Sequence, residues 1–271
     1  MLGKLKNFTA KLRRRADDRS RVLRGYAQAF IGSLRFSALP PGLTSFVYSA
    51  YAPDSAAVFA QHPEAPALWA KWQQGNRRNN TGDKGRFFAL LLNLKQLLKV
   101  DIAGDFAELG VYKGNSAAML AYFAARSGRK AVLLDTFGGF DDRDLVDIDR
   151  RPDFQRGFSD TSLAGVRLVV GEPDHCVYVP GYFPDSINPD LAARSYAFVH
   201  IDCDLYKPMK SALEFFYPRL TPGGMMFLHD YSSGPWAGAT SAIDEFCRNT
   251  GECLTLLPDK SGTAILRTRR R

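Results

Sequence analysis

Short apolar runs alternate with amphipathic segments over the second part of the chain. The runs are five to seven residues long and stand at 105–110, 131–135, 166–171, 196–202 and 224–230. Between them, segments such as 116–126 and 207–217 repeat apolar positions at helical spacing. This alternation predicts an α/β fold, with a Rossmann-like, doubly wound and mostly parallel sheet covered by helices on both faces.

The two ends of the chain depart from this alternation. Two β-like segments, 253–257 and 263–267, flank a Pro-Asp-Lys-Ser-Gly stretch, which predicts a C-terminal antiparallel hairpin. Residues 1–85 are mixed and mainly helical in pattern. We therefore predict an N-terminal basic tail with a helical extension over 1–85, which lines an acceptor pocket or acts as a lid, and an α/β domain over 86–271.

A glycine-bearing turn follows the first run. It contains Glu108, Gly110 and Gly114, and Asn115 and Ser116 then open a helix. Gly110 lets the backbone approach a ligand where a Cβ would clash, and Gly114 permits the turn into the helix. A dinucleotide-binding turn presents N–H groups to a pyrophosphate, which an acidic Glu108 would repel. A carboxylate there instead suits the cationic methionyl part of S-adenosylmethionine.

Asp135 ends the second run, twenty-one residues after Gly114. A carboxylate at this place accepts the hydroxyls of a ribose in both NAD and S-adenosylmethionine enzymes. Five alternating units with a terminal hairpin are the order of class I methyltransferases, whereas a dehydrogenase more often continues with a second βαβ half. We therefore predict an S-adenosylmethionine site. An NAD-dependent oxidoreductase and a non-catalytic scaffold that retains the cofactor fold are the alternatives. The residues expected to contact the cofactor are Glu108, Gly110, Gly114, Asn115, Ser116, Asp135, Thr136 and Asp202.

Acidic side chains also follow the fourth and fifth runs. Asp202 ends the fourth run and Asp204 follows it, and the fifth run ends in His229 and Asp230. Carboxylates gathered at one sheet edge repel each other unless a cation or a shared proton offsets them, and a hard divalent cation takes such oxygen ligands. The alternative is that Asp202 binds the cofactor and Asp230 caps the next loop.

Several stretches carry a family resemblance. They are FAELGVYKGNSA, LLDTFGGF, FSDTSLAGV, GYFPDSI, HIDCDLYKPMKSALEFFYPRLTPGGMMFLHDY and AIDEFCRN, between residues 80 and 250. Together they resemble the macrocin O-methyltransferase (TylF-like) family, which methylates sugar hydroxyls of macrolides and related natural products. The resemblance implies a magnesium-dependent O-methyl transfer, with Asp202 as a metal ligand and Asp204 in the place of the general base.

The implied chemistry is consistent with these residue types, except at one position. Magnesium would lower the pKa of an acceptor hydroxyl and orient it for in-line attack, and a nearby carboxylate would take its proton. Family members carry an Asp-Asp pair before the Tyr, whereas this chain has His229-Asp230. Imidazole is a poor magnesium ligand. Three alternatives stay open: a magnesium ion held by Asp202, His229 and Asp230; another ion such as manganese; or no metal, with His229 as a base.

The net charge of +8 is concentrated at the two ends of the chain. The first 25 residues hold nine Lys and Arg against two Asp, and the last five hold four Arg, so the middle is slightly acidic. A nucleic-acid enzyme carries its basic residues around the substrate cleft, and we therefore expect a small-molecule or glycolipid acceptor and no nucleic acid.

The N-terminal tail also bears on location and partners. Apolar residues recur at helical spacing at Leu2, Leu5, Phe8 and Leu12, which allows either weak contact with an anionic membrane surface or a solvated, frayed terminus. No apolar run reaches the roughly 20 residues that span a bilayer, and no secretory signal is recognisable. We expect a cytoplasmic protein. The sequence leaves the oligomeric state open, a homodimer included.

Overall fold

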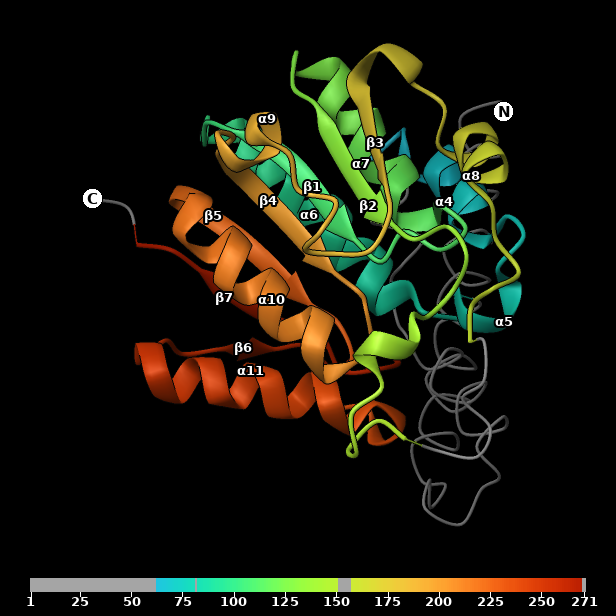
Figure 1. The fold of residues 1–271 in the computed structure, drawn as a ribbon. Helices are drawn as coiled ribbons and strands as arrows, with labels where there is room; N and C mark the ends of the chain where they lie inside the picture. The colour runs from blue at the N-terminus through green and yellow to red at the C-terminus, as the bar shows by residue number, and fades with distance from the viewer. Residues whose placement is uncertain (1–61, 81, 151–156, 270–271) are drawn as a thin grey trace, which may run out of the picture. The chain divides into compact units, whose positions relative to one another are not determined.

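The computed structural model describes residues 62–80, 82–150 and 157–269. Its seven-stranded sheet has the order β3-β2-β1-β4-β5-β7-β6 (Figure 1). The strands are β1 (Asp105–Leu109), β2 (Ala131–Asp135), β3 (Cys176–Pro180), β4 (Tyr196–Ile201), β5 (Leu220–Leu228), β6 (Thr255–Leu256) and β7 (Ala264–Arg267). The pairs among β1 to β5 are parallel, and β7 runs antiparallel to both β5 and β6. The predicted parallel sheet with a terminal antiparallel hairpin is therefore confirmed.

Helices cover both faces of this sheet, as Figure 1 shows. Alternate strand residues serve opposite cores: Phe106 of β1 packs in one and Ala107 in the other. The first core is shared with α4 (Ala65–Gln73), α6 (Lys84–Lys99), α7 (Asn115–Arg126) and α8 (Leu163–Val170), and the second with α9 (Pro189–Ala192), α10 (Tyr206–Phe216) and α11 (Ala237–Thr250). The period-two pattern of the strands thus builds two apolar layers around one sheet.

The third predicted strand is wrong. Residues 166–171 lie mostly in helix α8, and the third strand is β3, which pairs with β2. Ser162 caps this helix by accepting a hydrogen bond from the backbone N–H of Gly165, and Val166 and Val170 bury the same helical face. A short apolar run does not by itself distinguish a strand from a buried helix, and here the capping residue decides.

The described part of the predicted N-terminal extension is helical and packs on the sheet. It comprises α4 and the short α5 (Arg77–Asn80); α6 begins at its end and continues into the predicted α/β domain. Asp83 caps α6 through the N–H of Arg86, and Leu90 and Leu94 then face the first core. Residues 1–61, with the basic tail, lie outside the described residues. Within the described ranges, no helix has both the length and the apolar character needed to cross a membrane.

Candidate active site

A cavity of about 870 Å³ opens at the carboxyl ends of β1, β2, β4 and β5. Open parallel sheets bind ligands beyond these ends, where the strand order reverses, and here β1 and β4 are the strands on either side of the reversal. Most of the site residues predicted from the sequence line the cavity: Gly110, Asn115, Ser116, Asp135, Thr136, Asp202, Asp204, His229 and Asp230. Residues up to 120 positions apart in the chain are thus brought to one edge.

Gly110 lies where the backbone just after β1 closely approaches the backbone just after β4. Its φ is +89°, and a Cβ built there would lie 1.9 Å from the carbonyl oxygen of Asp202. The N–H of Asp202 also donates to the carbonyl of Leu109 at 2.9 Å. Only glycine fits this position, because the backbone after β4 passes so close; the predicted approach of Gly110 to a ligand stays a prediction.

The predicted cofactor residues Gly114 and Asp135 hold the loops around that turn. Gly114 has a φ of +83°, and a Cβ there would come within 2.9 Å of Val170 on α8. The Asp135 carboxylate accepts hydrogen bonds from the N–H groups of Tyr112, at 2.8 Å, and Phe137, at 2.6 Å. Asp135 therefore ties the loop after β1 to the loop after β2.

Asn115 leaves an acceptor at the cavity wall. Its Nδ2 donates to the carbonyl oxygens of Lys71, at 2.8 Å, and Gln74, at 2.7 Å. Its Oδ1 is buried and has no hydrogen-bond partner among the described residues. A cavity of this size with an unpaired acceptor, next to a glycine turn and the Asp135 carboxylate, fits S-adenosylmethionine.

Glu108 lies behind the cavity wall rather than in it. It is fully buried, receives a hydrogen bond from the Ser116 hydroxyl at 2.5 Å, and lies 2.7 Å from Nδ1 of His200, its register partner on β4. It is not among the cavity-lining residues. In this structure Glu108 positions Ser116 at the start of α7, and its contact with the methionyl part of the cofactor stays a prediction.

The acidic half of the cavity holds a tight cluster. Nδ1 of His229 lies 2.8 Å from Asp202 Oδ1 and 2.7 Å from Asp230 Oδ2. The three predicted metal ligands each bring one ligand atom within 4.8 Å of the others. On the other side of Asp202, Nη1 of Arg86 lies 3.0 Å from Oδ2. The structure therefore brings these side chains together and adds a cation to them.

Burial and neighbouring charges move the pKa values in this cluster in opposite directions. Burial alone would raise the pKa of Asp202, but His229 and Arg86 outweigh it and hold that pKa below its ordinary value. Burial and the nearby Asp230 and Asp202 raise the pKa of Asp204 well above its usual range. Asp202 is therefore the carboxyl group that stays ionised, and Asp204 is the one that holds a proton more readily.

The backbone carries strain at the same edge. Asp204 and Asp230 have left-handed φ values of +64° and +63°, and so do Tyr112 and Phe137, at +48° and +53°. Each lies in a loop that follows a parallel strand at the cavity. Such conformations cost free energy in residues with a side chain, and they persist where the surrounding structure holds a functional side chain in place.

Arg86 was not predicted from the sequence. It is only 6% exposed and stands in the first turn of α6, on the face that the helix buries. The available signal was its helical phase: Arg86 precedes Leu90 by four residues and shares the face that is buried. A charged residue on a buried helical face needs a partner, and here the partners are Asp83 and Asp202.

The donor set at Asp202, His229 and Asp230 does not fit magnesium. Magnesium requires octahedral oxygen ligands, and imidazole takes the place of one of them. Both carboxylate oxygens of Asp202 already face a nitrogen, one of Arg86 and one of His229. We therefore derive no catalytic step through a bound metal.

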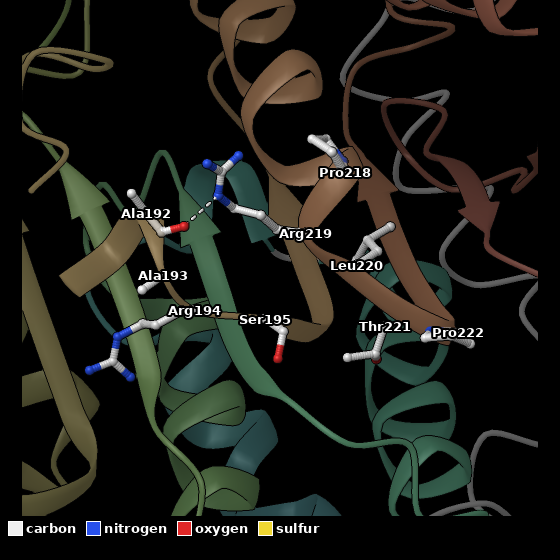
Figure 2. A pocket seen from close by; sticks show the side chains of 9 residues that line it. All are labelled: Ala192, Ala193, Arg194, Ser195, Pro218, Arg219, Leu220, Thr221 and Pro222. Carbon is white, nitrogen blue, oxygen red and sulfur yellow. Dashed lines mark hydrogen bonds between the residues drawn. The ribbon is translucent and has the colours of Figure 1, made fainter. Parts of the chain in front are cut away.

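A second hollow lies at the opposite edge of the sheet, before β4 and β5 (Figure 2). Arg219 crosses it to donate to the carbonyl oxygen of Ala192 at 3.0 Å, and Arg194 pairs with Asp105 beside it. Its lining contains neither a carboxylate nor an imidazole. Of these two hollows, the one at the carboxyl ends is therefore the one whose described lining offers groups for acid–base chemistry.

Two relatives with assigned reactions resemble this chain. An 8-demethyl-8-(2,3-dimethoxy-alpha-L-rhamnosyl)-tetracenomycin-C 4'-O-methyltransferase from Streptomyces olivaceus is 28% identical over 202 residues, which cover 70% of this chain and 76% of the relative. A mycinamicin III 3''-O-methyltransferase from Micromonospora griseorubida is 28% identical over 154 residues, 51% of this chain and 59% of the relative.

Solved structures share the fold. The O-methyltransferase NovP superposes with a TM-score of 0.60 at 22% identity, covering 69% of this chain and 80% of NovP. The calicheamicin methyltransferase CalS11 gives a TM-score of 0.57 at 23% identity, covering 76% and 91%. A profile of the macrocin-O-methyltransferase (TylF) family matches residues 80–255, more than half of the chain. The chain therefore belongs to the TylF macrocin O-methyltransferase family and is an S-adenosylmethionine-dependent O-methyltransferase.

Proposed function

We propose that this enzyme methylates a hydroxyl of a sugar, or of another small-molecule or glycolipid acceptor, with Asp204 as the general base. The observation that carries the proposal is the position of Asp204. It is 8% exposed, lines the cavity directly after β4, and is hydrogen-bonded to Asp230 after β5. The tetracenomycin relative, which is named for a rhamnosyl compound, supports a sugar acceptor.

S-adenosylmethionine supplies an electrophilic methyl group on its sulfonium. Gly110, Asn115 and Asp135 would hold it at the carboxyl ends of β1 and β2. An acceptor hydroxyl beside Asp204 would attack the methyl carbon, the carbon–sulfur electron pair would return to sulfur, and Asp204 would accept the hydroxyl proton. Asp204 shares a proton with Asp230, so that proton would pass to Asp230 as Asp204 accepts the new one.

Aromatic side chains form the acceptor side of the cavity. The rings of Phe140 and Phe158 lie 5.3 Å apart, and those of Phe140 and Trp236 lie 5.8 Å apart. Tyr112 extends the row, 5.0 Å from Phe158. All four line the cavity. Aromatic faces suit the apolar faces of sugar rings and of aromatic or polyketide aglycones, which supports a glycosylated acceptor.

A direct test compares cofactors before any acceptor is known. In isothermal titration, S-adenosylhomocysteine should bind the full chain and NAD should not. Transfer of a labelled methyl group from S-adenosylmethionine to a panel of glycosides should then identify the acceptor. The scaffold alternative would be favoured if the wild type binds S-adenosylhomocysteine but, like Asp204→Asn, transfers no methyl group to any glycoside or polyol offered.

A further inference from the structure

The charge arrangement around Asp202 differs from that of a divalent metal site. We propose that Arg86 supplies the positive charge, and His229 the bridging hydrogen, that offset these carboxylates in place of a divalent cation, so that the acidic cluster works without a bound metal ion. The inference rests on the proposed function, because it concerns how the same cluster handles the acceptor hydroxyl. It is carried by the contacts of these two side chains.

Each nitrogen of the Arg86 guanidinium contacts the side-chain oxygen of a different residue. Nη1 lies 3.0 Å from Asp202 Oδ2, Nε lies 3.0 Å from Asp83 Oδ2, and Nη2 donates to Asn80 Oδ1 at 3.1 Å. The guanidinium also lies over the ring of Trp72, 5.0 Å from its centroid. A guanidinium keeps its charge at every physiological pH. An ion that took Asp202 as a ligand would bring a second and third positive charge next to this fixed one.

His229 lies where the geometry requires a proton rather than a metal. Nδ1 is within hydrogen-bond distance of two carboxylate oxygens, from Asp202 and Asp230. Ionised carboxylates only accept hydrogen bonds, so Nδ1 must carry the hydrogen that links them. A nitrogen that ligates a metal must offer its lone pair and cannot carry that hydrogen. The same atom therefore bridges the carboxylates in place of an ion.

Each carboxylate of the cluster is thereby offset by a group of the chain itself. Arg86 faces Asp202, His229 lies between Asp202 and Asp230, and Asp204 is hydrogen-bonded to Asp230. Clustered carboxylates need a cation or a shared proton, and these contacts provide both. The chemical class of the ligand follows: the cluster takes a neutral hydroxyl, oriented by carboxylates and an imidazole.

Manganese serves as the probe, because its electron paramagnetic resonance signal reports binding without any acceptor. The full chain is stripped with chelator, loaded with S-adenosylhomocysteine, and titrated with Mn²⁺. We expect the wild type to bind none at the cluster. The double variant Arg86→Met/His229→Asp, which removes the cation and restores an Asp-Asp pair, should bind one Mn²⁺ per chain.

A matched control is Arg194→Met, which also removes an arginine paired with an aspartate but lies at the other edge of the sheet. It should bind Mn²⁺ no better than the wild type. One Mn²⁺ bound to the wild type, and displaced by magnesium, would overturn the proposal, as would a folded double variant that binds none. If the double variant does not fold, the wild-type titration still decides. Since no acceptor is used, failure here is distinct from failure of the proposed methyl transfer.

Discussion

The two edges of the sheet carry hollows at opposite ends of the same strands, β4 and β5. At the carboxyl ends, Asp202, Asp204 and Asp230 meet His229 in a cavity with strained loops. At the amino ends, Arg219 donates to the carbonyl oxygen of Ala192 (Figure 2), and Arg194 pairs with Asp105. The comparison indicates that the direction of the strands, rather than the presence of a hollow, determines which end of the sheet carries the reactive side chains.

The largest expected effect is that of Asp204→Asn. An amide cannot accept the hydroxyl proton, so methyl transfer should fall by about 10²- to 10⁴-fold. The affinity for S-adenosylhomocysteine, measured by titration calorimetry, should change little because Asp204 lies on the acceptor side. Asp204→Asn with wild-type turnover would remove Asp204 from the role of base and shift it towards His229.

Gly110→Ala should be next in size. The added Cβ would lie 1.9 Å from the carbonyl oxygen of Asp202, so β1 and β4 must separate at the cofactor turn. We expect S-adenosylhomocysteine binding to be lost and the unfolding free energy to fall by about 1–3 kcal/mol. Titration calorimetry measures the first and denaturant titration the second.

The matched control for that change is Gly128→Ala. Gly128 has a similar left-handed φ, +68°, but a Cβ there meets nothing within 4 Å. The unfolding free energy of this variant should fall only by the conformational cost of a left-handed alanine, about 1–2 kcal/mol, and its affinity for the cofactor should not change. Equal loss of affinity in both variants would mean that backbone conformation, and not the close approach of two strands, explains Gly110.

At the amino edge, Arg194→Met should affect stability slightly and methyl transfer not at all. Arg194 pairs with Asp105 at 2.5 Å, and both side chains are about a quarter exposed. Partly exposed ion pairs contribute about 1 kcal/mol or less to the unfolding free energy. A large loss of turnover in this variant would break the distinction between the two edges.

The smallest effect concerns the pH dependence of stability at Asp144, which lines the cavity. Burial raises the pKa of Asp144 to about 6, although the hydroxyl of Tyr182 donates to it at 2.8 Å. The folded state thus binds this proton more tightly than the unfolded state, so its contribution to stability is present at acidic pH and is lost as the pH rises through about 6.

Asp144→Asn removes that titration. The variant should unfold at a higher temperature than the wild type at pH 7.5, by a few degrees, and the difference should shrink towards pH 5. Thermal unfolding followed by circular dichroism at both pH values measures this. An identical pH dependence in the two proteins would show that Asp144 is not the titrating group.

Four of the five parallel strands were predictable because each carries its own apolar pattern and is followed by a distinctive residue. The sequence indicated that Gly110 permits a close approach, but the group that approaches it is the carbonyl of Asp202. The ribose contact of Asp135 stays a prediction. The error at 166–171 arose because the sequence shows apolar residues but not which partners bury them. Val166 and Val170 point to α7 and not to a neighbouring strand.

The acidic cluster was predicted from Asp202, Asp204 and Asp230, since strand ends converge at one edge. Its cation was not. Arg86 lies 116 residues before Asp202 and comes from a different layer, so only the packing of α6 on the sheet brings the two together. Glu108 lies inside β1, and its burial against Ser116 and His200 depends on the register between β1 and β4, which a single sequence does not contain.

The left-handed backbone at Asp204 and Asp230 has a consequence for how this enzyme tolerates change. Glycine adopts those φ values without strain, so replacing either aspartate with glycine would relax the loop while deleting a carboxylate. Selection for thermal stability alone would therefore favour inactive sequences at these two positions. A stabilisation campaign should therefore hold both positions fixed.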